Sequence, residues 1–200
     1  KLLGIDWDSR AIELAKQKLE KYQNRIILKT GNYTDIKRLV YESGFTPINA
    51  ILLDLGLSGD QLQDRSRGFS FQGPGALDMR FSDQGELTAA RIVNTWSEND
   101  LAHIFGEYGE ERHAARIAQH IVASRRSAPI NSVEELVAVV LRGAGVRGGS
   151  RIHPATRIFQ ALRIATNQEL RNLSQVLPAA LDLLAPGGRV AVISFHSLED

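Results

Sequence analysis

Short apolar runs and stretches of helical periodicity alternate in the first quarter of the chain. Apolar runs at residues 2–6, 26–28 and 50–53 predict three buried strands. Between them, apolar residues recur at helical spacing over residues 9–19 and 36–40, which predicts two amphipathic helices. Buried strands separated by such helices are typical of a parallel sheet that is covered on both faces.

Polar residues indicate where these two helices start and stop. Asp8 or Ser9 is placed to cap the first helix, and Thr34 is placed to cap the second. Side-chain oxygens at these positions accept hydrogen bonds from the first helical turn. Gly44 is expected to end the second helix, because glycine adopts the left-handed conformation that closes many helices.

The pattern changes in the next third of the chain. Residues 56–85 form a glycine-rich stretch with little periodicity, and a loop of this length inside a compact domain is usually functional. Helical periodicity follows, with a Gly/Arg loop at residues 143–153. Residues 155–184 predict a long helix or a helix pair that is interrupted near Pro178.

Capping signals divide this helical stretch into separate helices. Thr88, Ser97 and Ser132 are placed as N-caps, and Glu135 completes a capping box with Ser132. Apolar residues at helical spacing predict a further helix over residues 110–126.

The simplest assembly of these elements is an α/β doubly wound sheet with a helical insertion. A last apolar run at residues 189–195 is expected to join the earlier strands in one sheet. We therefore predict that residues 1–85 and 166–200 form the two parts of a sheet domain. Residues 86–165 would form an all-helical subdomain inserted between them.

Composition excludes several classes of protein. Of the 200 residues, 43% are hydrophobic and 24% are charged, which is enough apolar material for a core. The absence of cysteine excludes a disulfide scaffold, a thiolate zinc site and a cysteine nucleophile. No run of about 18 apolar residues is present to span a membrane, and the start does not resemble a signal peptide. We expect a reducing, cytoplasmic compartment and no metal site. Because the chain opens with Lys1 inside an apolar run, we interpret it as a fragment of a longer protein.

Charge is balanced in number but uneven in position. The chain has 24 basic and 23 acidic residues, and every lysine lies within residues 1–37. No acid lies between Glu135 and Glu169, whereas five arginines do. An acid-free, arginine-only window suits a phosphate-bearing partner better than a solvated surface. A local fluctuation in a near-neutral protein explains the window equally well, and charge alone leaves the two readings open.

Polar residues follow the predicted strands at their carboxyl ends, where open α/β sheets bind ligands. Asp6 ends the first strand, where an acid can accept hydrogen bonds from ribose hydroxyls, although it could instead cap the next helix. Asp54 ends the third strand and precedes Gly56, which would let the backbone approach a ligand; the alternative is a simple turn residue. Tyr33 follows the second strand, where its ring could stack on an adenine or serve only in packing. His196 is the only histidine placed at a strand end.

A set of ordered motifs carries a specific resemblance. The motifs lie at residues 51–58, 61–62, 67–71, 77–80, 108–112, 153–157, 159–164 and 193–200. In this order they resemble the RsmH (MraW) family of ribosomal RNA small subunit methyltransferases, and the resemblance covers nearly all 200 residues.

The resemblance implies an enzyme that uses S-adenosyl-L-methionine to methylate N4 of a cytidine in 16S rRNA. It also implies a Rossmann-like class I methyltransferase sheet with a helical insertion that recognises RNA. The cofactor contacts that carry over are Asp6 (to the ribose), Tyr33, Asp54 and Gln61. The family's glycine-rich first motif would precede Lys1. Gly59 and Asp60 stand where the family usually has a serine and a proline, so we expect a changed loop shape without lost binding.

Catalysis on this reading requires acceptors for the cytosine amino protons and a base that removes one of them. Asp54, Ser194 and His196 are the candidates, and His196 is the only neutral-pH base at a strand end. The candidate RNA-binding residues are Arg80, Arg112, Arg116, Arg157 and Arg163. The partners would be 16S rRNA or the small ribosomal subunit and, in one arrangement, a second copy of the chain.

Two other classes of protein remain as alternatives. A nucleotide-binding dehydrogenase fits the sheet, but it leaves the arginine-rich insertion unexplained. The other is an RNA-binding module that has lost catalysis, and a fragment without the glycine-rich loop could behave in that way. Binding of NAD in place of S-adenosyl-L-methionine, or of RNA without either cofactor, would favour one or the other.

Overall fold

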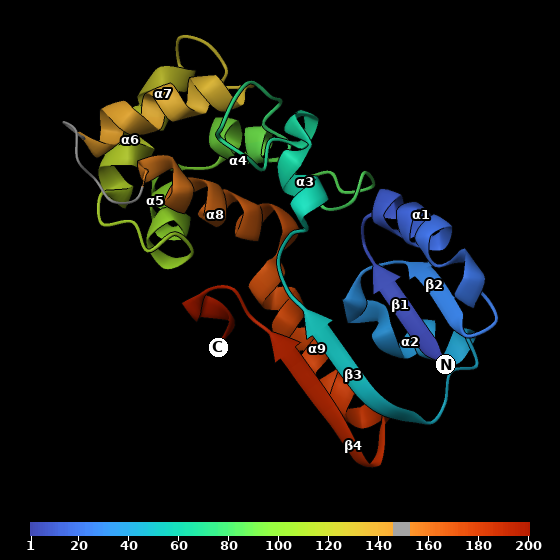
Figure 1. Cartoon of the computed structure of the whole chain (residues 1–200). Helices are drawn as coiled ribbons and strands as arrows, with labels where there is room; N and C mark the ends of the chain where they lie inside the picture. The colour runs from blue at the N-terminus through green and yellow to red at the C-terminus, as the bar shows by residue number, and fades with distance from the viewer. Residues whose placement is uncertain (146–152) are drawn as a thin grey trace. The chain divides into compact units, whose positions relative to one another are not determined.

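The computed structural model describes residues 1–145 and 153–200 (Figure 1). The chain divides into two compact units. The sheet unit comprises Lys1–Gly56, Phe81–Asp83 and Glu169–Asp200, and the helical unit comprises Leu57–Arg80 and Gln84–Gln168. Most of the predicted Gly/Arg loop, with Arg147 and Arg151, lies outside the described residues.

The sheet unit contains the four predicted strands in two parallel pairs. Strand β1 (Leu2–Asp6) pairs with β2 (Ile26–Thr30), and β3 (Ile48–Asp54) pairs with β4 (Leu184–Ile193). The prediction of parallel pairing is therefore confirmed for both pairs. The prediction that all four strands share one sheet is not confirmed, because the two pairs are not hydrogen-bonded to each other and form two two-stranded sheets. An apolar run predicts a strand but does not specify which strand lies next to it.

Three helices and three single 3₁₀ turns complete the sheet unit. They are α1 (Ser9–Lys18), η1 (Glu20–Tyr22), η2 (Tyr33–Asp35), α2 (Ile36–Glu42), α9 (Glu169–Leu183) and η4 (Ser197–Glu199). The predicted cap of α1 is confirmed, since the Asp8 carboxylate accepts a hydrogen bond from the Arg10 backbone N–H at 3.0 Å. Thr34 does not cap α2. Instead, Asn32 accepts from the Thr34 N–H at 3.0 Å and caps the 3₁₀ turn that precedes α2.

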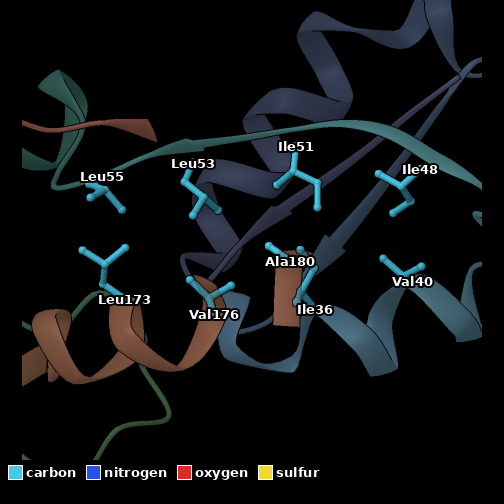
Figure 2. Close-up of a cluster of buried hydrophobic side chains, with 9 residues drawn as sticks. All are labelled: Ile36, Val40, Ile48, Ile51, Leu53, Leu55, Leu173, Val176 and Ala180. Carbon is cyan, nitrogen blue, oxygen red and sulfur yellow. The ribbon is translucent and has the colours of Figure 1, made fainter. Parts of the chain in front are cut away.

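The core of the sheet unit lies between β3 and the helices α2 and α9 (Figure 2). It contains Ile48, Ile51, Leu53 and Leu55 of the β3 segment, Ile36 and Val40 of α2, and Leu173, Val176 and Ala180 of α9. On the opposite face of β3, Leu52 is 63% exposed. The expected cover is thus shown for one face of this pair, where α2 and α9 pack against β3.

The helical unit is built from six helices and one 3₁₀ turn among its described residues. They are α3 (Gly59–Gln63), η3 (Arg65–Arg67), α4 (Ala89–Thr95), α5 (Glu98–Glu107), α6 (Ala114–Arg125), α7 (Val133–Ala144) and α8 (Pro154–Asn167). Its core is formed by side chains of successive helices, including Ile92, Phe105, Ile117, Leu136 and Leu162, which are almost completely buried.

The capping predictions for the helical unit are confirmed. Thr88 accepts from the Arg91 N–H at 3.1 Å, Ser97 caps α5, and Ser132 and Glu135 form a capping box at the start of α7. Capping is a local interaction between residues two or three apart, which is why the sequence reveals it.

Two predicted helix boundaries are wrong. The helix expected from residue 110 begins only at Ala114, because Glu110 has a positive φ of 49° that a right-handed helix cannot include. The interruption expected near Pro178 occurs at Gln168, where φ is 52°, and Pro178 lies inside α9.

Candidate active site

The candidate residues of the sheet unit lie at the carboxyl ends of its paired strands. Asp6 is opposite Thr30 in the β1–β2 pair, and Asp54 is opposite Ile193 in the β3–β4 pair. Asp54 and the segment that begins at Ser194 therefore leave neighbouring strands together. This is the edge of a parallel sheet at which ligands bind in open α/β folds.

The Asp6 carboxylate is exposed and tied to the loop that follows β1. Its Oδ1 accepts a hydrogen bond from the Asp8 backbone N–H at 2.7 Å. Asp8 rather than Asp6 caps α1, so the alternative reading of Asp6 as the helix cap is wrong. This bond orients the carboxylate at the end of the strand.

The turn after β3 combines an exposed carboxylate with a glycine in a conformation that other residues avoid. Asp54 is exposed at the end of the strand. The Leu55 N–H donates to the Ile193 carbonyl at 3.1 Å and continues the pairing one residue further. Gly56 then takes a φ of 86°. A Cβ atom at Gly56 would lie 3.6 Å from Phe195 Cδ2, an ordinary contact, so the backbone conformation rather than space requires glycine.

Tyr33 is a half-buried phenol between two acidic residues. Its hydroxyl donates to the Glu169 backbone carbonyl at 3.5 Å, and its ring packs against the core of the sheet unit. Burial, the Glu169 charge and the Glu199 charge together raise the pKa of Tyr33 to about 12. The phenol therefore stays protonated near neutral pH. The packing role of the ring is observed, and stacking on an adenine stays a prediction.

The segment after β4 is folded around the carboxylate of Glu199. Glu199 Oε2 accepts from the Phe195 N–H at 2.8 Å, and Oε1 lies 3.2 Å from His196 Nε2. The Glu199 side chain is only 3% exposed, and both His196 ring nitrogens are buried. Ser194 Oγ donates to Asp200 Oδ1 at 3.0 Å. Glu199 thus places a negative charge beside the His196 ring.

The N-terminal end of α9 connects these features. Helix α9 packs against both η2 and η4, and the charges of Glu169 and Glu199 both act on Tyr33. Sequence reasoning found Tyr33 and His196 but missed both glutamates. The signal for Glu199 was its position three residues after His196 in a motif, whereas nothing local marks Glu169.

Gln61 lies in the helical unit and closes the first turn of α3. Its Oε1 accepts from the Ser58 N–H at 2.9 Å, and its own N–H donates to Ser58 Oγ at 3.2 Å, which completes a capping box. Gly59 and Asp60 occupy the helical positions between them. Gln61 thus has a structural role, and its contact with a cofactor stays a prediction.

Three of the candidate RNA-binding arginines have partners within the helical unit. Arg116 Nε donates to the Gly143 carbonyl near the end of α7, and Arg157 Nη1 lies 3.6 Å from Glu111 Oε2. Arg80 has an ion pair with Asp78, with Nη2 2.8 Å from Oδ2.

Arg112 is exposed and makes no hydrogen bond or ion pair with the part of the chain that the structure describes. Arg163 lies on α8, and its carbonyl accepts from the Asn167 side chain at 3.0 Å.

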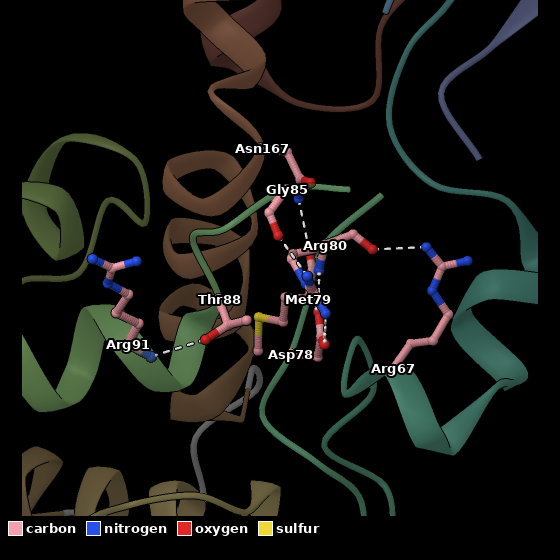
Figure 3. A network of polar contacts seen from close by, with 8 residues as sticks. All are labelled: Arg67, Asp78, Met79, Arg80, Gly85, Thr88, Arg91 and Asn167. Atoms are coloured by element: carbon pink, nitrogen blue, oxygen red, sulfur yellow. Dashed lines mark hydrogen bonds and ion pairs between the residues drawn. The ribbon is translucent and has the colours of Figure 1, made fainter. Parts of the chain in front are cut away.

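Arg80 belongs to a polar network that holds a left-handed residue in the core of the helical unit (Figure 3). Met79 is fully buried and has a φ of 61°. Its N–H donates to the Arg67 carbonyl at 2.8 Å, and its carbonyl accepts from Asn167 Nδ2 at 2.7 Å. Arg80 also donates to the Gly85 carbonyl, and its own carbonyl accepts from Arg67 Nη2 at 2.7 Å. Backbone bonds on both sides thus hold an unfavourable conformation.

Asp78 is the anionic member of this network. Burial would raise the pKa of Asp78, but the hydrogen bonds and charge of Arg80, with the charge of Arg67, hold it below its ordinary value. Asp78 is therefore ionised near neutral pH, and its carboxylate oxygens receive the Arg80 Nε and Nη2 at 2.8 Å each.

Neither a metal cluster nor a membrane span occurs in the described part of the chain. Within residues 1–145 and 153–200, no three His, Asp or Glu side chains are grouped as ligands for a metal ion. No helix in these ranges is long and apolar enough to cross a membrane.

Comparisons with known proteins match the whole chain. The family model described as the MraW methylase family matches residues 1–200. Three similar proteins carry the name "Ribosomal RNA small subunit methyltransferase H". That of Thermomicrobium roseum is 54% identical over 199 residues, which cover 100% of this chain and 61% of the relative. That of Syntrophotalea carbinolica is 50% identical over 202 residues, covering 100% and 64%. That of Coprothermobacter proteolyticus is 48% identical over 198 residues, covering 99% and 65%. The chain thus spans less than two thirds of the length of each.

Proposed function

The chain belongs to the MraW methylase family, and from this premise we propose that it transfers a methyl group to the N4 amino group of a cytidine in small-subunit (16S) ribosomal RNA. The methyl donor we propose is S-adenosyl-L-methionine. The three relatives share the name of a ribosomal RNA small subunit methyltransferase. The observation that carries the proposal is the pair of exposed carboxylates, Asp6 and Asp54, at the carboxyl ends of parallel strands.

We further propose that the sheet unit has a Rossmann-like, class I methyltransferase topology. In the doubly wound strand order 3-2-1-4-5, strand 1 carries the glycine-rich loop and lies between the pairs 3-2 and 4-5. Two separate parallel pairs, β1–β2 and β3–β4, are compatible with that order. The helical insertion, predicted at residues 86–165 and compact together with residues 57–80, would then recognise the RNA.

The chemistry of the strand-end residues suits S-adenosyl-L-methionine. The Asp6 carboxylate would accept hydrogen bonds from the ribose hydroxyls, and Tyr33 would lie beside the adenine. Asp54 would contact the remainder of the cofactor, and Gly56 with its φ of 86° lets the backbone approach a ligand closely. When bound, this cofactor supplies a methyl group on a positively charged sulfur, which is a strong electrophile.

The residues of the chain would mainly position the cytosine. Its amino lone pair is delocalised into the ring, so alignment of the nitrogen with the methyl group is the principal requirement. Asp54, and Ser194 directly after the neighbouring strand β4, would accept hydrogen bonds from the amino group and hold it in place. The base must be unpaired or flipped from its stack to reach this edge of the sheet.

His196 would take the proton that leaves the amino group. Glu199 lies 3.2 Å from Nε2, so it would orient the ring and leave Nδ1 to accept the proton. Because both ring nitrogens are buried, the segment from Ser194 to Asp200 would have to open toward the bound base. Glu199 is thus a positioning residue that acts through His196.

The proposal is tested by methylation of small ribosomal subunits with S-adenosyl-L-methionine that carries a labelled methyl group. Nucleoside digestion and mass spectrometry should locate the label on N4 of a cytidine. A label on another base or atom would overturn the proposed substrate. Calorimetric titration separates the alternatives, because binding of NAD and not of S-adenosyl-L-methionine would overturn the methyltransferase reading.

A further inference from the structure

Two aromatic rings of the helical unit form a stack that the proposed reaction does not use. The ring centroids of Phe71 and His153 lie 4.9 Å apart, and the ring planes differ by only 13°. Phe71 also meets Phe159 edge-on, with centroids 5.6 Å apart and planes at 76°. Phe159 is buried at 4% exposure, whereas His153 is exposed. The stack therefore runs from the core of the helical unit to its surface.

The His153 ring is fixed on a second side by helix α8. Its Nδ1 accepts a hydrogen bond from the Ala155 backbone N–H at 3.2 Å, which makes His153 the N-cap of the helix. Serine, threonine, aspartate and asparagine are the usual N-caps, and each is smaller than a ring. Histidine at this position adds a flat aromatic surface whose orientation is already set, so a ligand that stacks on it loses little entropy in ordering the protein.

Positive charge lies next to the stack. Arg157 follows His153 by one helical turn on α8, and its side chain remains 33% exposed although it lies 3.6 Å from Glu111. Arg112 adjoins Glu111 in sequence and is exposed. Helix α8 itself contains no acidic residue. The charge of Glu111 is thus paired with Arg157, whereas Arg112 makes no ion pair with the described residues.

We propose that Phe71 and His153 form a stacking platform for an unpaired base of the RNA substrate, with Arg112 and Arg157 binding the adjacent phosphates. Proteins recognise single-stranded RNA by stacking its splayed bases on aromatic side chains and by placing arginines along the backbone. The exposed His153 ring stacks on Phe71, which meets the buried Phe159, and Arg157 lies on the acid-free helix α8, so the arrangement matches this chemistry. The inference rests on the proposed function, because it assigns a second contact to the same RNA.

The test separates stacking from helix capping with two substitutions at one position. His153→Asn keeps a good N-cap and removes the ring, whereas His153→Phe keeps a ring and removes the cap. The probe is a single-stranded RNA that contains 2-aminopurine, whose fluorescence falls when it stacks. We expect His153→Asn to weaken binding roughly 5- to 150-fold and to abolish the quenching, with an unchanged thermal midpoint. His153→Phe should bind within about threefold of the unmodified protein and unfold at a lower temperature.

Two further variants complete the test. Phe71→Leu keeps apolar contact with Phe159 and should lose affinity as His153→Asn does. Tyr41→Ala removes another exposed aromatic side chain, 67% exposed on α2, and should leave affinity unchanged. Unchanged affinity and quenching in His153→Asn would overturn the platform.

Methylation of small subunits by the same variants keeps this result separate from the proposed function. If the unmodified protein methylates rRNA and His153→Asn has the same KM, the platform is wrong and the proposed function stands. If the unmodified protein binds and quenches the probe but transfers no methyl group, the platform stands and the proposed function is wrong.

Discussion

The candidate residues of the two units differ in their exposure and in the partners that hold them. In the sheet unit, Asp6 and Asp54 are exposed at strand ends, and Asp6 accepts a hydrogen bond from the loop that follows β1. In the helical unit, Arg80 and Arg116 donate to carboxylate and carbonyl oxygens of their own unit. A strand-end carboxylate is positioned by topology, whereas an arginine on a helix can serve packing, capping or a ligand. Residue type and exposure therefore separate the candidates better than charge patterns do.

The largest effect should come from Asp54, if the strand-end carboxylates serve ligands rather than the fold. Asp54→Asn keeps the size of the side chain and removes its charge, so we expect kcat/KM for methyl transfer to fall at least about 100-fold. The thermal midpoint should not change, because Asp54 is exposed. A labelled-methyl assay with scanning calorimetry measures both.

Glu13→Gln is the matched control for this experiment. Glu13 is an exposed carboxylate that pairs with Lys16 on α1, away from the strand ends, and its loss should change neither activity nor stability. Activity of Asp54→Asn within threefold of this control would remove Asp54 from the site.

At Asn167, in contrast, we expect the substitution to lower stability. Asn167→Ala leaves the buried Met79 carbonyl without its 2.7 Å hydrogen bond, which should lower the free energy of unfolding by about 2–3 kcal/mol. Denaturant titration measures the change, and Asn24→Ala at an exposed position serves as the control. Equal stabilities for the two variants would show that the network does not hold the left-handed residue.

Within the helical unit, substitutions of Arg80 and Arg112 should differ in whether they change stability or RNA affinity. Arg80→Lys cannot keep the two-pronged contact with Asp78, so we expect about 1 kcal/mol lower stability and little change in RNA affinity. Arg112→Ala should leave stability unchanged and reduce the salt dependence of log Kd by about 0.7. Filter binding of single-stranded RNA at several salt concentrations separates the two. A matching loss of affinity in both variants would contradict the division made here.

The smallest expected effect is on the stability of the protein at acidic pH. The pKa of Asp78 is lowered in the folded protein from the ordinary value of 3.8. Its contribution to stability is therefore complete above that value and is lost as the pH falls through the lower folded pKa. Asp78→Asn should flatten the decline of unfolding free energy below about pH 4. The same decline in both proteins would show that other carboxylates account for it.

Local interactions explain which parts of the fold could be predicted. The Ser132–Glu135 capping box and the cap at Asp8 involve residues close in sequence, so residue types alone revealed them. The cap at Asn32 was missed because it serves a 3₁₀ turn with no apolar periodicity. The break at Gln168 was missed because a left-handed glutamine carries no sequence signal, whereas Pro178 does and is tolerated inside α9.

The candidate site shows the same limit. The positions of Asp6 and Asp54 at the carboxyl ends of their strands could be predicted, because each residue directly follows an apolar run. Glu169 could not, because its position beside Tyr33 depends on the packing of α9 against η2. The separation of the strands into two pairs was equally inaccessible, since pairing depends on strand order and not on apolar runs.

The left-handed conformation of Gln168 has a consequence at long range. A β-branched residue there would favour an uninterrupted helix, because it disfavours a positive φ. The chain would then enter α9 along another direction, and the Glu169 carbonyl that receives the Tyr33 hydroxyl would move with it. Substitution of Gln168 could in this way alter the proposed cofactor site, and glycine or asparagine should be the replacements that are tolerated best.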